Sequence, residues 1–118
     1  MKKLFYLLTC DTCKRLMASW NIPESLELRE IKSRGLSEEE LDALHELTGS
    51  YEALFSKRAR LYKERGLAKE KLGEEQFRAL LLEHYTFLKR PVLIWDEQIF
   101  IGNSKKTAEA VQDFLKDK

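Results

Sequence analysis

The sequence predicts an α/β protein with a mixed four-stranded sheet, built in the order βαβ, a helical insert, and ββα. Three observations predict this fold. An apolar run at 3–8 is followed by a segment of helical spacing and then by alternating residues at 25–31. A helical insert occupies about 37–86, and two short apolar runs, 92–95 and 98–101, follow it. Strand, helix and strand in this order favour a parallel pair joined by a right-handed crossover.

The chain length and composition favour a single folded domain. A chain of 118 residues supports one hydrophobic core, so we expect one domain spanning 1–118. A hydrophobic content of 43% with 35% charged residues is typical of a globular protein. Because 21 Lys and Arg residues oppose 20 Asp and Glu residues, the net charge of +1 gives no general attraction to nucleic acid or to membranes, and we expect neither as a direct partner.

The N-terminal segment predicts where the protein resides. Its apolar run at 4–8 is too short for a secretory signal, and no small-residue cleavage site follows it. No segment approaches the roughly 20 apolar residues that span a bilayer. We therefore expect a cytoplasmic protein, whose thiols are kept reduced.

The first part of the chain is expected to form strand, helix and strand. Residues 3–8 are continuously apolar, which is typical of a strand buried on both faces. Helical spacing starts at Cys13 and ends at 21–23, where Asn-Ile-Pro stops the helix. Alternation at 25–31 predicts the second strand. The apolar positions on which these two predictions depend are Leu16, Met17, Trp20, Leu26, Leu28 and Ile31.

The middle of the chain is predicted to be helical. Ser37 is a good N-cap, and a glutamate three residues later completes a capping box. Gly49 is expected to end that helix. A short helix is predicted at 51–55, a helical turn at 61–67, and a longer helix at 74–85.

The last part of the sequence predicts a β-hairpin followed by a helix. The runs 92–95 and 98–101 flank a two-residue turn, which is typical of a β-hairpin. Asn103 or Ser104 is expected to cap the last helix. The buried face of that helix is expected to carry Ala108, Val111, Phe114 and Leu115.

The two cysteines lie together in the motif Cys-Asp-Thr-Cys at 10–13, where the first strand turns into the first helix. The thiolate is the reactive form of cysteine, and a helix N-terminus stabilises an anion. Lys14 and Arg15 add positive charge nearby. We expect Cys10 to be the more exposed thiol, so we predict Cys10 as the nucleophile and Cys13 as the resolving thiol.

Two other interpretations of the cysteine pair remain open at this stage. A Cys-x-x-Cys motif is also half of a zinc site. No further cysteine exists, and His45 and His84 lie in separate helical segments, so we expect no metal. The two thiols could also be inert and buried, although their place at a strand-to-helix turn favours a reactive pair.

Pro91 begins the third predicted strand directly after Lys89 and Arg90. One interpretation is a proline that simply opens a strand. The other is a cis peptide bond, which would expose the backbone of the preceding residue to whatever approaches the thiol. Cis bonds are a small minority of X-Pro bonds, so both interpretations stand.

Three segments, in this order, resemble the ArsC/Spx family. They are Cys-Asp-Thr-Cys-Lys at 10–14, Leu-Phe-Ser-Lys-Arg-Ala-Arg-Leu-Tyr-Lys at 54–63, and Lys-Arg-Pro-Val-Leu-Ile at 89–94 continuing to Ile-Gly at 101–102. This family comprises glutaredoxin-coupled arsenate reductases, their relatives and the Spx redox regulators. The resemblance covers nearly the whole chain and implies a thioredoxin-like fold with a helical insertion and a cis proline at Pro91.

The resemblance also implies roles for individual residues. Cys10 matches the catalytic cysteine, and Arg90 matches an arginine that helps to hold an oxyanion. A guanidinium offers a planar fork of donors to an arsenate or a thiolate. The remaining residues of the expected substrate-binding set are Thr12, Lys14, Arg58 and Pro91. Such an enzyme would act on a small oxyanion or a disulfide without a cofactor, with glutathione, glutaredoxin or thioredoxin as its reductant.

Some residues resemble Spx more than the reductases. The reductases usually have another residue at the place of Cys13, and they carry arginines where this chain has Ser56 and the segment 103–106. In Spx a Cys-x-x-Cys pair oxidises, and the protein contacts the RNA polymerase α subunit. Gly49 resembles the glycine of that contact and is equally a helix-ending glycine.

The sequence therefore predicts a thiol-dependent oxidoreductase of the arsenate reductase-like family. Its alternative is an Spx-type redox-sensing regulator that binds the RNA polymerase α subunit. A redox-inert domain that keeps the fold is the third hypothesis.

Overall fold

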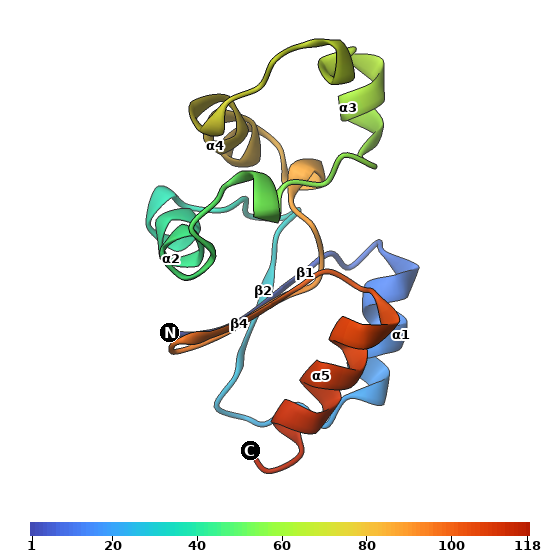
Figure 1. Cartoon of the computed structure of the whole chain (residues 1–118). Coiled ribbons are helices and arrows are strands. Elements are labelled where there is room, and N and C mark those ends of the chain that lie inside the picture. Colours follow the sequence, from blue (N-terminus) through green and yellow to red (C-terminus); the bar gives the residue numbers. More distant parts are fainter. The chain divides into compact units, whose positions relative to one another are not determined.

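The computed structural model describes residues 1–118. The chain divides into two compact units, which we call the sheet unit, Met1–Ser33 with Arg90–Lys118, and the helical unit, Arg34–Lys89. The sheet unit contains both cysteines, and the helical unit contains the expected insert (Figure 1). The single-domain organisation expected from the sequence stays a prediction.

The sheet unit is built on a mixed four-stranded sheet, as the sequence predicts. Its strands are β1 (Lys2–Tyr6), β2 (Glu27–Glu30), β3 (Val92–Trp95) and β4 (Gln98–Ile101). Their order across the sheet is β2-β1-β3-β4, with β1 parallel to β2 and antiparallel to β3. The pairing of β1 with β3 places the start of β3 beside the end of β1, where the cysteine motif follows.

Two helices of the sheet unit pack against the strands. They are α1 (Asp11–Ser19) and α5 (Lys105–Leu115), which lie side by side in Figure 1. Apolar residues from β1, β3 and both helical segments form one core, so burial of their surface is the main force that holds the unit together. Its buried members are Leu4, Trp20, Leu26, Leu93, Val111 and Leu115. The indole N–H of Trp20 donates to the carbonyl of Ala108 (3.1 Å) and ties α1 to α5.

The first strand is shorter than the sequence predicts. It ends at Tyr6, and the side chain of Leu8 is 57% exposed rather than buried. The chain turns here because the N–H of Cys10 donates to the carbonyl of Leu7 (3.0 Å) and the N–H of Leu8 donates to the Glu30 carboxylate (3.0 Å). The turn also starts α1 two residues before the helical spacing does.

The second strand is also shorter than expected. Only Glu27–Glu30 pairs with β1, and Leu28 on this edge strand is 47% exposed. Leu26 and Ile31 are buried, but they lie in the bends before and after the strand. The apolar alternation at 25–31 therefore covers one short strand and the bends on either side of it.

The helical unit begins with the predicted capping box. The N–H of Glu40 donates to the Ser37 hydroxyl (3.0 Å), and the Glu40 carboxylate accepts from the N–H of Ser37 (3.0 Å). The α-helices of this unit are α2 (Glu38–Thr48), α3 (Arg60–Glu64) and α4 (Glu74–Glu83), and its single 3-10 turns are Glu52–Leu54, Leu67–Lys69 and Tyr85–Phe87. The long helix predicted at 74–85 ends at Glu83 because His84 is extended and its Nδ1 accepts from the N–H of Thr86 (3.1 Å).

Aromatic side chains form the core of the helical unit. The ring of Phe55 lies 5.8 Å from Tyr62, 4.9 Å from Phe77 and 5.1 Å from Phe87, centroid to centroid. Stacking and edge-to-face contacts of this kind add to the stabilisation from burial. This cluster joins α3 and α4 to the 3-10 turns on either side of them.

Gly49 ends α2 in a left-handed conformation (φ 72°), and its N–H donates to the carbonyl of His45 (2.7 Å). A Cβ at this position would meet no atom within 4 Å, so a substitution costs backbone strain alone. We expect Gly49→Ala to lower the free energy of unfolding by about 1 kcal/mol. We expect Gly49→Asn to cost less, because asparagine tolerates this conformation. Urea unfolding measures both effects, and equal stability of the alanine variant and the wild type would contradict the assignment.

Candidate functional site

The cysteine motif lies at the N-terminus of α1. Cys10 is the N-cap residue, with extended backbone angles (φ −93°, ψ 110°), and its carbonyl accepts from the N–H of Lys14 (3.1 Å). Cys13 lies in the first turn of the helix. Both thiols are free, and Cys10 is half-buried whereas Cys13 is fully buried. Cys10 is therefore the more exposed thiol, as the sequence predicts.

The environment of Cys10 favours its thiolate. Burial raises the pKa of Cys10, but the backbone N–H and thiol of Cys13, together with the charge and hydrogen bonding of Arg90, outweigh that effect and hold the pKa below its ordinary value. The Cys10 side chain makes no capping hydrogen bond as a thiol. The backbone N–H of Cys13 lowers the pKa of Cys10 because it can donate a hydrogen bond to the thiolate, which is how a helix N-terminus stabilises an anion.

The environment of Cys13 has the opposite effect. Burial, the hydrogen bond with Cys10 and the negative charge of Cys10 raise the pKa of Cys13 to about 11, against smaller opposing effects of Leu7 and Arg90. The two thiols share one site, and their pKa values are displaced in opposite directions. The site thus favours the thiolate form at Cys10 and the thiol form at Cys13.

Arg90 comes from the other end of the chain. The Arg90–Pro91 peptide bond is cis, in agreement with the resemblance stated above. Two hydrogen bonds fasten this loop to the segment after β4: Asn103 Nδ2 donates to the carbonyl of Arg90 (3.2 Å), and the N–H of Gly102 donates to the carbonyl of Pro91 (2.9 Å). The guanidinium that lowers the pKa of Cys10 is held in place by this anchored loop.

The other predicted site residues are distributed unevenly. Thr12 and Lys14 lie on α1, where Thr12 is half-buried and Lys14 is exposed. Arg58 is exposed and belongs to the helical unit. The main favourable effects on the pKa of Cys10 come from Cys13 and Arg90 rather than from the neighbouring cations that the sequence suggested.

Glu30 is a supporting residue that the sequence analysis missed. Its carboxylate accepts from the N–H of Leu8 (3.0 Å) and from the N–H (2.7 Å) and hydroxyl (2.9 Å) of Ser33. Burial raises the pKa of Glu30, but these donors outweigh that effect and lower it. Glu30 thereby holds the loop that leads to Cys10, and no local pattern signals this because the two segments are 22 residues apart.

The two histidines belong to the helical unit. His45 stacks on Tyr51 (4.0 Å between centroids), and His84 stacks on Tyr85 (4.5 Å). No group of three or more histidine, cysteine, aspartate or glutamate side chains is placed to hold a metal ion. None of the helices combines the length and the apolar character that crossing a membrane requires.

Comparisons with known proteins place this site in context. The model of the ArsC family matches residues 5–111. An ArsC family related protein from Bacteroides fragilis has 25% sequence identity, with a TM-score of 0.74 over 93% of this chain and 96% of that one. An arsenate reductase from Vibrio cholerae has 21% identity and a TM-score of 0.71, over 97% of each chain. An arsenate reductase (ArsC) related protein from Brucella melitensis has 23% identity and a TM-score of 0.66, over 92% of each.

The structural matches agree on the fold. They extend over nearly the whole chain and identify it as thioredoxin-like with a helical insertion. A comparison with curated protein sequences found no match.

Proposed function

Because the chain belongs to the ArsC family, we propose that it is a thiol-dependent oxidoreductase with Cys10 as nucleophile and Cys13 as resolving thiol. The observation that carries this proposal is a pair of free thiols at the N-terminus of α1, with Cys10 half-buried at the N-cap and Cys13 buried in the first turn. Their pKa values support it, because that of Cys10 lies below its ordinary value and that of Cys13 is raised to about 11. Thiol–disulfide exchange needs one thiolate that attacks first and a second thiol that stays protonated until its turn.

The reaction proceeds in two exchanges. The Cys10 thiolate attacks one sulfur of a substrate disulfide, a new bond joins Cys10 to that sulfur, and the other substrate sulfur leaves as a thiolate. Cys13 then gives up its proton to solvent and attacks the sulfur of Cys10. The Cys10–Cys13 disulfide forms and the second substrate thiolate leaves, so two electrons have passed to the substrate. A reducing dithiol, or two molecules of glutathione, returns them.

The arrangement of the site explains why the second step follows the first. The negative charge of Cys10 contributes to the raised pKa of Cys13, and that charge disappears once Cys10 is part of a mixed disulfide. The pKa of Cys13 therefore falls in the intermediate, when its thiolate is needed. Arg90 stabilises the Cys10 thiolate at the start and again when Cys10 is the leaving group during re-reduction.

A disulfide is the substrate class that the site supports best, because Cys13 supplies a resolving thiol within the chain. The relative from Vibrio cholerae is described as an arsenate reductase, and an oxyanion remains a proposed alternative substrate. Arg90 beside Cys10 is the donor available to such an anion in the sheet unit. Glutathione, glutaredoxin and thioredoxin are the proposed reductants. The cytoplasmic location and the contact with the RNA polymerase α subunit stay predictions.

The pH dependence of Cys10 reactivity tests the proposal. We expect the reduced protein to react with neutral 2,2′-dipyridyl disulfide through a group that titrates below the pKa of a free thiol, because Cys13 and Arg90 hold the pKa of Cys10 below its ordinary value. Arg90→Gln is expected to move that midpoint to higher pH, because the charge that favours the thiolate is removed. Stopped-flow measurement of thiopyridone release gives both profiles.

Lys116→Gln is the matched control, since it removes one positive charge at the far end of α5 and is expected to leave the midpoint in place. A midpoint equal to that of a free thiol, or one that Arg90→Gln does not move, would contradict the role assigned to Arg90 and Cys10.

A further inference from the structure

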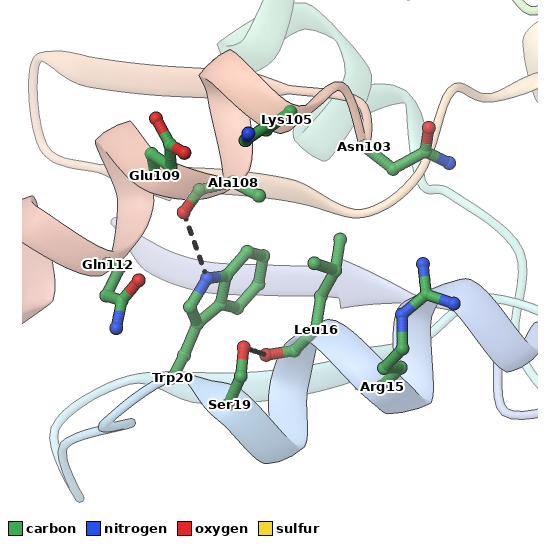
Figure 2. A pocket seen from close by; sticks show the side chains of 9 residues that line it. All are labelled: Arg15, Leu16, Ser19, Trp20, Asn103, Lys105, Ala108, Glu109 and Gln112. Carbon is green, nitrogen blue, oxygen red and sulfur yellow. Dashed lines mark hydrogen bonds between the residues drawn. The ribbon is translucent and has the colours of Figure 1, made fainter.

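A groove of about 350 Å³ runs between α1 and α5 within the sheet unit (Figure 2). Its volume lies at the lower end of the range of ligand-binding pockets. Apolar atoms of Leu16, Trp20 and Ala108 form part of its lining. Two polar groups of this lining already have partners: the indole N–H of Trp20 donates to the Ala108 carbonyl (3.1 Å), and the Ser19 hydroxyl donates to the Leu16 carbonyl (2.7 Å).

The two cationic side chains of the groove are available to a ligand. Arg15 extends from α1 and Lys105 from the opposite wall on α5 (Figure 2), and both are exposed without a carboxylate within salt-bridge distance. Their sequence neighbours Lys14 and Lys106 are exposed as well. Two positive charges thus line the groove on opposite walls, and each has an exposed lysine next to it in sequence.

The first turn of α5 carries two lysines, although positive charge at the N-terminus of a helix is unfavourable. Lys105 and Lys106 are the first two residues of the helix, and its first turn contains no acidic residue. The positive end of the helix dipole repels cations at these positions. In the same chain, α2 and α4 both begin with glutamates, which the dipole favours. A local arrangement that opposes helix stability is expected where function requires it.

The basic end of the groove is the end nearest to the reactive thiol. Arg15 follows Cys10 by five residues, about 7.5 Å along a helix axis. Asn103, which lines the same end, is bonded to the carbonyl of Arg90, whose guanidinium lowers the pKa of Cys10. Glu109 and Gln112 line the groove farther along α5.

We propose that the α1–α5 groove docks an acidic segment of the protein whose disulfide or thiol exchanges with Cys10. This inference rests on the proposed role of Cys10 and identifies the class of its protein partner. Arg15 and Lys105 line opposite walls of the groove, and a segment with several carboxylates can pair with both along its length. Glu109 at the far end opposes a continuous polyanion, so a short acidic segment fits better than a nucleic acid. Opposite charges of this kind mainly increase the rate of encounter.

The first test measures exchange with three synthetic peptides. Each carries one cysteine activated as a 2-thiopyridyl disulfide, flanked by glutamates, by serines or by lysines. We expect the acidic peptide to react with the reduced protein about tenfold faster than the serine peptide, and the lysine peptide to react more slowly than both. The advantage should shrink between about 0.01 M and 1 M salt, over which the screening length falls from roughly 30 Å to 3 Å.

Charge reversal in the groove tests its part in that preference. In the double variant Arg15→Glu/Lys105→Glu, the ratio of the acidic-peptide rate to the serine-peptide rate is expected to fall about tenfold and to lose its salt dependence. The double variant Lys116→Glu/Lys118→Glu makes the same change of charge at and beyond the other end of α5 and is expected to keep the ratio. A ratio near one in the wild type, or a preference that survives Arg15→Glu/Lys105→Glu, would overturn the proposal and leave the chemistry of Cys10 intact.

The second test detects docking without chemistry. The chain has two tryptophans, Trp20 in the groove and Trp95 on β3, so their indole N–H resonances provide a probe and an internal reference. In the Cys10→Ser protein, a cysteine-free glutamate peptide is expected to shift the Trp20 resonance and leave that of Trp95 unchanged. An unmoved Trp20 resonance would overturn the docking site. An equal shift with free glutathione at the same concentration would overturn the choice of a protein segment.

These two tests separate the inference from the proposed function. If no peptide disulfide reacts at Cys10, the proposed oxidoreductase fails, and the Trp20 titration still decides whether the groove binds acidic segments.

Discussion

Cys10→Ser is expected to lower the rate of exchange with a disulfide substrate by on the order of 10⁴-fold or more. A serine hydroxyl is not ionised near neutral pH, so the anion that Arg90 and the N–H of Cys13 stabilise is lost. The measurement is the release of thiopyridone from 2,2′-dipyridyl disulfide by reduced protein, under the conditions that give the wild-type rate.

Cys13→Ser is the informative companion to this variant. It is expected to keep the first exchange and to stop there, because the thiol that resolves the intermediate is missing. Intact-mass spectrometry should show one covalently attached substrate thiol on Cys13→Ser, and an internal disulfide without adduct on the wild type. Near-normal turnover in Cys10→Ser, or no trapped adduct in Cys13→Ser, would refute the assignment of the two roles.

Phe55→Ala is expected to lower the free energy of unfolding by about 3–5 kcal/mol. The Phe55 side chain is 1% exposed, and its ring contacts the rings of Tyr62, Phe77 and Phe87. Truncation removes buried apolar surface, leaves a cavity and breaks three aromatic contacts at once. Urea unfolding, followed by circular dichroism, measures the change.

Leu28→Ala is a suitable control for this prediction. Leu28 is 47% exposed on the edge strand β2, so its truncation is expected to change stability by no more than about 0.5 kcal/mol. Equal losses in the two variants would show that the aromatic cluster does not form the core of the helical unit.

Local patterns in the sequence predicted most of the secondary structure. The hairpin strands β3 and β4 have the predicted bounds, because an apolar run on each side of a two-residue turn is a purely local signal. The capping box at Ser37 and the left-handed Gly49 were predicted for the same reason. The predictions for β1 and β2 extended too far, because apolar residues such as Leu8 and Leu26 lie in bends whose hydrogen bonds involve other segments or nearby turns.

The candidate site was predicted in part. The positions of the two thiols follow from a cysteine motif between a strand and a helix, and their difference in exposure follows from that location. The predicted effect of the helix N-terminus on the Cys10 pKa agrees with the hydrogen bond from the backbone N–H of Cys13, whereas Lys14 and Arg15 are not among the main effects. The structure assigns that effect to Cys13 within the motif and to Arg90, which is 80 positions away in sequence.

The sequence alone determined the fold class, the family resemblance and the pair of cysteines at the start of the first helix. The tertiary structure decided which groups shift the pKa values of the two thiols and which hydrogen bonds hold the loop before them. Pairing of β1 with β3 brings the Arg90 loop to Cys10, Glu30 on β2 fastens the loop before the motif, and the packing of α1 against α5 creates the basic groove. Periodicity and capping depend on neighbours in sequence, whereas Coulomb interactions and hydrogen bonds between distant segments depend on how the whole sheet closes.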